Sequence, residues 1–97
     1  MYKVKYLPSF ENDLIEAEDY LFDRSPPAVD KLTDAINKQM QSVEEHPYMY
    51  PVYPGFDDIR YMALPYQYLL FYTVDKERKY IDVYRILRGM RDIPNLL

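Results

Sequence analysis

The 97-residue sequence contains no cysteine and no tryptophan, and it has only one histidine and two glycines. Without cysteine the chain can form neither a disulfide framework nor a thiolate metal site, and it offers no thiol nucleophile. His46 alone would need mostly carboxylate partners to hold a metal, and the sequence shows no such cluster around it. We therefore expect neither a metal ion nor a cofactor in this protein.

Long hydrophobic runs are also missing. No apolar stretch approaches the ~20 residues that span a membrane. The beginning, "MYKVKYLPSFEND", turns acidic too early for a signal peptide. The sequence accordingly predicts a cytoplasmic protein without a membrane partner.

Tyrosine is the residue type that is unusually frequent, with twelve copies among 97 residues. A tyrosine ring buries well while its hydroxyl finds water or a partner, which suits both cores and interfaces. The hydrophobic fraction of 48% is sufficient for one modest core, and the length leaves no room for two. We expect a single domain over residues 1–97, with most tyrosines in the core and some at an interface.

The first half of the chain predicts one strand and two helices. Residues 2–7 alternate between apolar and charged side chains, which is typical of a half-buried strand. Pro8 is expected to end this strand, and Ser9 to cap a helix that runs to about Arg24. After so short a break, Ser25 and a following proline predict the start of a second helix, which stops before a proline at position 47. The two helices should form an antiparallel hairpin.

The second half predicts a sheet. Residues 47–58 hold three prolines and read as a loop, and the segments 59–64, 68–74 and 80–87 are rich in β-branched and aromatic residues. Two short turns separate these segments, so they should form two consecutive antiparallel hairpins, with residues 68–74 central and covered on both faces. The predicted fold is α+β in the order β-α-α-β-β-β, with the helical hairpin across one face of a small sheet.

Charge is divided along the same boundary. Residues 1–58 carry five basic and twelve acidic side chains, while residues 59–97 carry seven basic and four acidic ones. The segment "YRILRGMRDI" at 84–93 alone holds Arg85, Arg88 and Arg91. A net charge of −4 therefore conceals an acidic helical part and a basic sheet with its tail.

The segment "YLLFYTVDKERKYIDVYRILRGMRDIPNLL" resembles the RelE/ParE superfamily of toxins from bacterial type II toxin–antitoxin modules. The likeness lies in an apolar strand that ends in Tyr-x-Val-Asp, a charged turn, a strand reading Arg-Ile-Leu, a basic-Gly-x-Arg-Asp stretch and a leucine-rich end. "RYMALP" fits as well, with Arg60 at a position that is often basic in relatives. The resemblance implies the β-α-α-β-β-β fold and an antitoxin whose disordered segment folds on the toxin.

RelE-like members of this superfamily are ribonucleases that cut messenger RNA on the ribosome. Such cleavage needs a general base, a general acid and cations near the phosphate. The start of the strand at 68, where an arginine is sought, holds a tyrosine. The positions after "RIL" hold no His-Tyr pair, and His46 reads as a cation at a helix C-terminus. The ribonuclease hypothesis stays open. A local cationic patch is available from Arg60, Arg85 and Arg88, and a tyrosine at position 66, 68 or 84 is available as the general acid.

ParE-like members bind DNA gyrase instead, without a catalytic centre of their own, and the tail of this sequence is more similar to theirs. One departure is Arg88, where many relatives have a histidine. We expect the last strand and tail to provide a cationic surface for gyrase or for the antitoxin. The candidate binding residues are Arg60, Tyr84, Arg85, Arg88, Arg91 and Asp92.

The resemblance thus predicts a growth-inhibiting toxin of the kind that stabilises plasmids. No catalytic residue is assigned. A third hypothesis is a non-toxic interaction module, which the acidic composition favours. Both a homodimer and a toxin–antitoxin hetero-oligomer remain open as assembly states.

Overall fold

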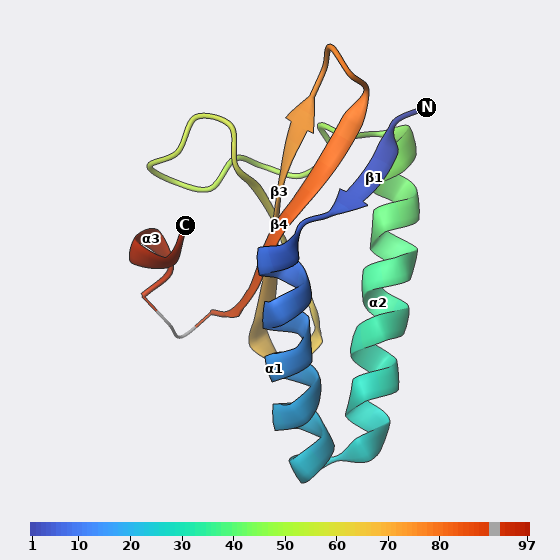
Figure 1. Ribbon diagram of the computed structural model, residues 1–97, viewed down its shortest axis with the longest axis vertical. Helices are drawn as coiled ribbons and strands as arrows, with labels where there is room; N and C mark the ends of the chain where they lie inside the picture. Colours follow the sequence, from blue (N-terminus) through green and yellow to red (C-terminus); the bar gives the residue numbers. More distant parts are fainter. Residues whose placement is uncertain (90–91) are drawn as a thin grey trace.

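The computed structural model describes residues 1–89 and 92–97 (Figure 1). Strand β1 (Lys3–Tyr6) leads into helices α1 (Pro8–Arg24) and α2 (Pro26–Glu45). Strands β2 (Arg60–Ala63), β3 (Tyr68–Asp75) and β4 (Tyr80–Arg88) follow, with a 3₁₀ turn at Pro65–Gln67 and a last short helix α3 (Ile93–Leu96). The predicted β-α-α-β-β-β order and the α+β class are confirmed. None of the helices in the described residues is both long and apolar enough to cross a membrane.

The sheet has the order β1-β4-β3-β2, so the first and fourth strands are neighbours. β2, β3 and β4 form the two predicted antiparallel hairpins. β1 pairs in parallel with β4 over Lys3–Tyr6 and Tyr80–Val83 only. The remainder of β4, from Tyr84 to Arg88, therefore has a strand on one side alone, and this bare edge becomes important for the site.

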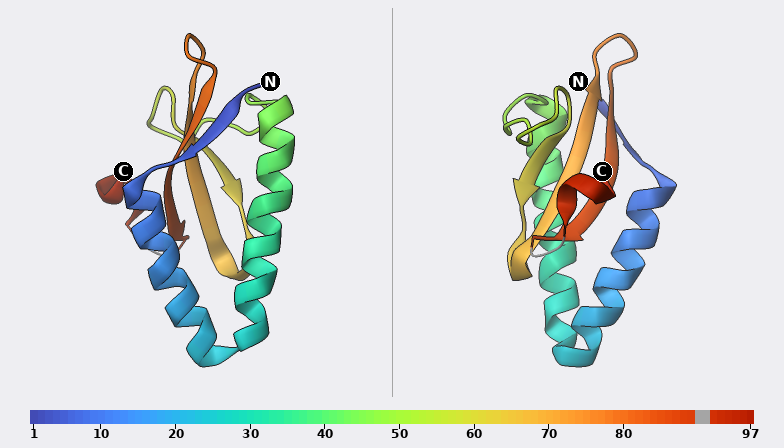
Figure 2. Two further views of the ribbon diagram at one scale, coloured as in Figure 1. Left: turned by 45° about the vertical axis from the view of Figure 1, so that its right-hand side comes forward. Right: turned by 90° about the vertical axis from the view of Figure 1, so that its left-hand side faces the viewer.

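The two faces of the sheet carry separate hydrophobic clusters. The larger cluster joins the helical hairpin to the inner face of the sheet, and its fully buried members include Leu32, Leu70 and Ile81. The smaller cluster lies on the outer face around Phe71, Leu87 and Ile93. In the right-hand view of Figure 2, α3 lies in front of the sheet and α2 behind it. The prediction that β3 is covered on both faces is confirmed.

A β-bulge in β4 decides which side chains face the helices. Phe71 pairs with Arg85, but the next residue of β3, Tyr72, pairs with Val83, so Tyr84 is an extra residue. Ile81 and Val83 face the helices before the bulge, and Ile86 faces them after it. Because of this one-residue shift, Arg88 lies on the helical side of the sheet rather than on the outer side.

The start of α1 differs from the sequence prediction. Pro8 is the first residue of the helix and Leu7 occupies the N-cap position, so the assignment of Ser9 as the cap is wrong. The fixed φ of proline suits the first helical position, where its missing N–H costs nothing. Ser25 does occupy the N-cap position of α2, although its side chain makes no capping hydrogen bond.

Candidate binding surface at the end of strand β4

Arg85 is held by a carboxylate from α1. Its Nε donates to Asp13 Oδ2 at 2.6 Å and its Nη2 donates to Asp13 Oδ1 at 3.0 Å, a two-pronged ion pair. The side chains of Arg85 and Asp13 are only 22% and 8% exposed. The hydrogen bonds to Asp13 raise the pKa of the Arg85 guanidinium, although burial acts in the opposite direction. Arg85 is therefore paired with Asp13, and its contribution to a cationic surface for a partner stays a prediction.

Helix α1 also covers the bare edge of β4. Ser9 Oγ donates to the carbonyl of Tyr84 at 2.7 Å, and Asp13 Oδ2 accepts from the amide of Ile86 at 3.2 Å. Two side chains thus replace the hydrogen bonds that β1 would make if it continued along β4. This explains why Asp13 is buried on the apolar side of α1, next to Phe10 and Ala17.

The tail is fastened to the same strand. Arg85 Nη1 donates to the carbonyl of Leu96 at 2.7 Å, and the hydroxyl of Tyr84 donates to the carbonyl of Leu97 at 3.0 Å. Ile93 is buried against the outer face of the sheet. Tyr84 and Arg85 therefore join β4 and the tail into one unit, which α1 supports through Asp13.

The other predicted site residues have different surroundings. Asp92 is exposed and accepts a hydrogen bond from the side-chain amide of Asn95. Arg91, and with it the predicted pairing of Arg91 with Asp92, lies outside the described residues. Arg60 is anchored to the proline-rich loop, since its Nη1 donates to the carbonyl of Tyr50 at 2.6 Å and its guanidinium lies 4.9 Å from the ring centre of Tyr48.

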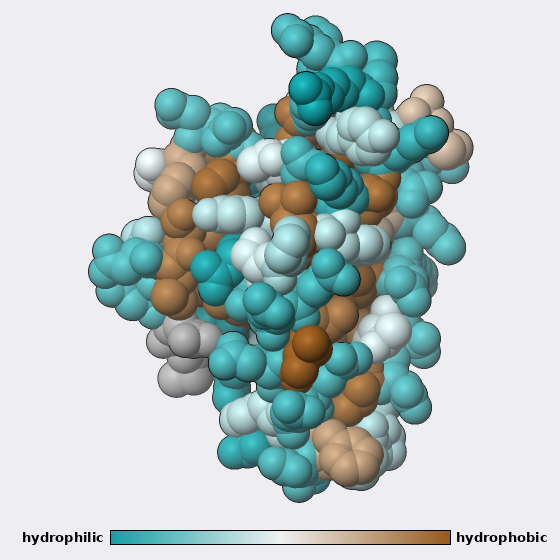
Figure 3. Space-filling view, in the orientation of Figure 1, coloured by the Kyte–Doolittle hydropathy of each residue, from teal (hydrophilic) through white to brown (hydrophobic). Residues whose placement is uncertain are grey.

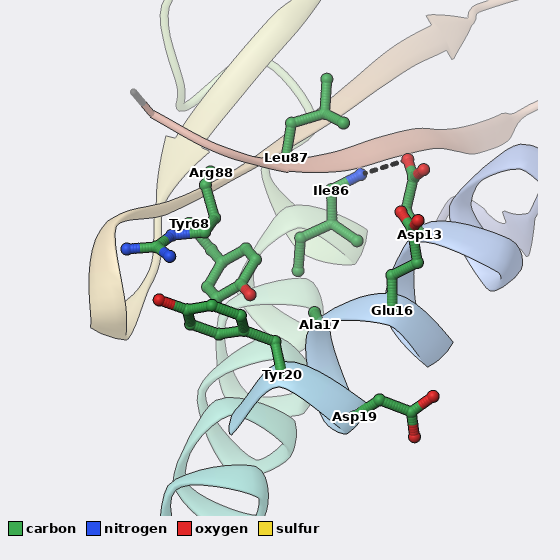
Figure 4. Close-up of a pocket in the computed structure, with 9 residues that line it drawn as sticks. All are labelled: Asp13, Glu16, Ala17, Asp19, Tyr20, Tyr68, Ile86, Leu87 and Arg88. Atoms are coloured by element: carbon green, nitrogen blue, oxygen red, sulfur yellow. Dashed lines mark hydrogen bonds between the residues drawn. The ribbon is translucent and has the colours of Figure 1, made fainter. Parts of the chain in front are cut away.

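Arg88 lies in a pocket of about 330 Å³ between α1 and the end of β4 (Figure 4). Its guanidinium carbon lies 4.5 Å from the ring centre of Tyr20. Its Nε is buried and has no hydrogen-bond partner in the described part of the chain. The same pocket is lined by Asp13, Glu16 and Asp19, and Figure 4 shows Asp19 pointing away from Arg88. Among the candidate arginines that the structure describes, Arg88 is therefore the one whose donors are least engaged.

The residues considered for RNA cleavage have different surroundings in the described chain, since Tyr66 and Tyr68 each line a pocket together with Arg88 while Tyr84 and His46 do not. The Tyr84 hydroxyl is occupied by the tail. Burial raises the pKa of Tyr68, an effect that Arg88 partly opposes. His46 follows the C-terminus of α2, whereas Ala28 near the other end of this 20-residue helix lies close to Arg88. A helix of that length spans about 30 Å, so the imidazole is remote from the arginine.

Three residues were not found from the sequence: Asp13, Tyr20, and Arg24, whose guanidinium carbon lies 3.6 Å from the centre of the Tyr20 ring. Asp13 lies three residues after Phe10 and four before Ala17, which places an acid on the buried stripe of the helix. Tyr20 and Arg24 have the i, i+4 spacing of a contacting pair. These spacings were visible in the sequence, but the partners Arg85 and Arg88 come from a distant strand.

Comparison with known proteins agrees with this architecture. Residues 4–93 match the family model described as the ParE toxin of the type II toxin–antitoxin system parDE. No curated protein matches the chain in sequence. Among solved structures, a chain of the chromosomal ParDE system from P. aeruginosa is 20% identical with a TM-score of 0.73, and the alignment covers 91% of this chain and 96% of that one.

Two further structures come from E. coli, and their likeness shows the shared fold. A chain of the intact RelBE toxin–antitoxin complex is 16% identical with a TM-score of 0.66, covering 94% of this chain and 100% of that one. The isolated RelE toxin is 15% identical with a TM-score of 0.66, and both chains are covered completely. The family match extends over nearly all of the sequence, and it agrees with the fold and with the predicted resemblance. This chain therefore belongs to the ParE toxin family of type II toxin–antitoxin systems.

Proposed function

We propose that this chain inhibits growth by binding DNA gyrase in the cytoplasm, without a catalytic centre of its own, and that a cognate antitoxin neutralises it. The observation that supports this proposal best is the unit formed by β4 and the tail. Arg85 and Tyr84 donate hydrogen bonds to the carbonyls of Leu96 and Leu97, so the described residues of the tail lie against β4 without a partner. A preorganised protein surface lowers the entropic cost of association, which suits a binding toxin.

A gyrase cleavage assay tests the target. The purified chain is mixed with gyrase of the host, supercoiled plasmid and ATP, and gyrase-linked linear DNA is measured. We expect linear DNA to accumulate with the wild-type chain and to decrease at least fivefold with Arg88→Gln. Arg78→Gln serves as a matched control, because Arg78 is an exposed arginine on the turn between β3 and β4.

The alternative activities give different results in the same experiment. Absence of linear DNA together with messenger RNA cut on purified ribosomes would replace the gyrase proposal by the ribonuclease reading. Absence of both effects, and normal growth of bacteria that express the chain alone, would leave the non-toxic interaction module. Either result contradicts the function proposed here.

We further propose that a segment of the antitoxin binds the apolar groove between α1 and α2. This groove of about 260 Å³ is lined by Phe10, Leu14 and Ile36, with Glu11 and Glu18 among its polar residues. Figure 3 shows hydrophobic residues between hydrophilic ones over the helical hairpin. A disordered segment that folds as an amphipathic helix would place its apolar side chains in such a groove.

Neighbouring substitutions on α1 test this location. Leu14→Lys places a charge in the groove, whereas Ile15→Lys changes the next residue, which is 57% exposed on the same helix. We expect Leu14→Lys to weaken binding of the co-expressed antitoxin at least tenfold in calorimetric titration, and Ile15→Lys to leave it within twofold. Equal effects of the two substitutions would contradict this placement, without affecting the gyrase assay.

A further inference from the structure

A second pocket adjoins the first and shares Tyr20 and Arg88 with it. It has a volume of about 380 Å³ and lies between the junction of α1 and α2 and the turn that connects β2 to β3. Its lining residues are Tyr20, Leu21, Arg24, Ser25, Ala28, Tyr66, Gln67 and Arg88. Two guanidinium groups and no carboxylate line this pocket, although the whole protein is acidic.

Tyr20 brings the two arginines together. The guanidinium carbon of Arg24 lies 3.6 Å from the centre of the Tyr20 ring, and that of Arg88 lies 4.5 Å from it. Both distances are measured to the centre of the Tyr20 ring, so the two guanidinium carbons are at most about 8 Å apart. Arg24 is fixed further by the hydrogen bond from its Nη1 to the carbonyl of Tyr20 at 3.1 Å. Two like charges are thus held close to each other at one pocket.

Neither arginine of this pair forms a salt bridge within the described chain. The only salt bridge among the residues that the structure describes joins Arg85 to Asp13, so neither Arg24 nor Arg88 has a carboxylate within 4.0 Å there. Arg88 additionally keeps its Nε buried without a partner in these residues. A buried donor without an acceptor costs free energy, because it has lost its hydrogen bond to water. A bound anion that accepts a hydrogen bond from this guanidinium would offset the cost.

The turn at the rim of the pocket has a backbone conformation that is unusual for its residues. Tyr66 and Gln67 both have positive φ, 64° and 65°, a conformation that normally requires glycine or asparagine. The turn is fastened to the end of β4, because the Gly89 amide donates to the carbonyl of Gln67 at 2.7 Å. Non-glycine residues in this conformation are typical of ligand sites. Here they place an exposed phenol and an amide beside the two arginines.

We propose that this pocket, with Arg24, Arg88 and Tyr20 as its main residues, binds a single carboxylate side chain of a partner protein. Both guanidinium groups can donate to such an anion, and the apolar lining from Leu21 and Ala28 suits the methylene groups of a glutamate. The adjoining pocket holds Asp13, Glu16 and Asp19. These acids repel an extended polyanion such as nucleic acid more strongly than a single carboxylate, which carries one charge.

The test is a titration of the isotope-labelled full chain followed by NMR of the arginine Nε–H groups, and it does not involve gyrase. The probes are the capped tripeptide Leu-Glu-Leu, its neutral counterpart Leu-Gln-Leu, and a single-stranded oligothymidylate at the same ionic strength. We expect saturable shifts of the Arg24 and Arg88 signals with Leu-Glu-Leu, and at least fivefold weaker shifts with Leu-Gln-Leu. Arg78 should not respond.

Variants separate the pocket from the rest of the surface. Arg24→Gln and Arg88→Gln should each weaken Leu-Glu-Leu binding at least fivefold, while Arg78→Gln should leave it unchanged. Circular dichroism of each variant verifies that the fold is kept, and Arg24→Gln, an exposed residue, keeps the test valid if Arg88→Gln does not fold. Equal binding of both peptides, or tighter binding of the oligothymidylate at these arginines, would overturn the proposal. Failure of the gyrase assay leaves this result unaffected.

Discussion

At the scale of single residues, Asp13 has more structural connections than its position in an acidic helix indicates. One carboxylate accepts hydrogen bonds from the Arg85 side chain and from the Ile86 amide, and Arg85 in turn holds the tail. Such an arrangement offsets the cost of burying two charges only because all the partners are present. Loss of a single member should therefore cost more than loss of an exposed ion pair.

Substitution of Asp13 should show this dependence. Asp13→Ala leaves Arg85 without its carboxylate and Ile86 with an unpaired amide, so we expect the free energy of unfolding to fall by about 2–4 kcal/mol. Urea denaturation at pH 7 provides the measurement. Asp19→Ala is the control, because Asp19 is exposed on the same helix, and its effect should stay within about 0.5 kcal/mol. Similar effects of the two substitutions would show that the buried pair contributes little.

Tyr72 gives a prediction for alkaline pH. Its side chain is fully buried, its hydroxyl donates to the Pro47 carbonyl at 2.9 Å, and burial raises its pKa to about 12, an effect that Arg60 partly opposes. An unfolded tyrosine titrates near pH 10. The unfolded state therefore loses this proton first, and the stability that Tyr72 contributes below pH 10 is lost as the pH rises towards 12.

The comparison with Tyr72→Phe isolates this effect from the other tyrosines and lysines. Between pH 8 and pH 11 the wild type should lose about 1.4 kcal/mol more of its unfolding free energy than the variant. Urea denaturation at the two pH values measures the difference. Parallel losses in both proteins would mean that Tyr72 titrates normally in the folded state.

At the scale of secondary-structure elements, two irregularities of the sheet position the candidate residues. The bulge at Tyr84 places Arg88 on the helical face, while Arg85 pairs with Phe71 on the outer face. The turn after β2 adopts positive φ at Tyr66 and Gln67 and meets the end of β4. The turn closes the β2–β3 hairpin and the bulge shifts the register of β4, so both irregularities belong to the fold and also position the candidate residues.

Replacement of the strained turn should stabilise the protein and reduce its binding function together. The double substitution Tyr66→Asn with Gln67→Gly supplies the residues that a turn with two positive φ angles prefers. We expect the free energy of unfolding to rise by about 1–2 kcal/mol, measured by urea denaturation. Binding of the capped Leu-Glu-Leu peptide should weaken at least twofold. A destabilised variant would show that the Tyr66 ring contributes packing that outweighs the backbone strain.

The tail gives a second prediction at this scale. Ile93 is buried against Phe71 and Leu87, although it belongs to a helix of only four residues. We expect Ile93→Ala to lower the free energy of unfolding by about 2 kcal/mol, near the lower limit for a buried isoleucine, because a terminal segment relaxes more easily than a core element. Urea denaturation measures the effect. Asn95→Ala, at an exposed position of the same helix, should change the stability by less than about 0.5 kcal/mol.

At the scale of the whole molecule, the acidic and basic side chains are segregated. The helical hairpin and the loop carry the excess of acid, and the strands with the tail carry the excess of base. The Asp13 carboxylate compensates the charge of Arg85, whereas Arg60 keeps its full charge while it donates to loop carbonyls. Nucleic-acid affinity depends mainly on phosphate neutralisation, so this molecule is poorly suited to bind DNA or RNA by itself.

Fluorescence anisotropy with labelled oligonucleotides tests that expectation. At 150 mM salt the chain alone should show no binding to duplex DNA or single-stranded RNA at micromolar concentrations. Binding to gyrase, in contrast, should not require DNA. Micromolar affinity for either nucleic acid, with a steep dependence on salt, would favour direct recognition of nucleic acid instead.

Much of this structure follows from local patterns in the sequence. The alternation in residues 2–7 and the apolar stripe of residues 26–45 predict their elements because each periodicity reflects one face that packs on the core, which is partly buried in β1 and fully buried in α2. The turn at 65–67 and the charged turn after Asp75 predict both hairpins. The prediction of Ser9 as a cap was wrong because α1 already begins at Pro8. The Ser9 hydroxyl donates to the Tyr84 carbonyl at the edge of β4 instead.

The sequence by itself determined the order of elements, the family and the segregation of charge, because periodicity, turn residues and composition act over short stretches of chain. Only the tertiary structure decided which arginines are paired. Asp13 and Arg85 are 72 residues apart, and their contact depends on β1 ending early and leaving an edge that α1 covers. The grouping of Arg24, Tyr20 and Arg88 likewise depends on the bulge in β4, which shifts Arg88 to the helical face. A pairing register is a property of two strands together, so one stretch of sequence cannot specify it.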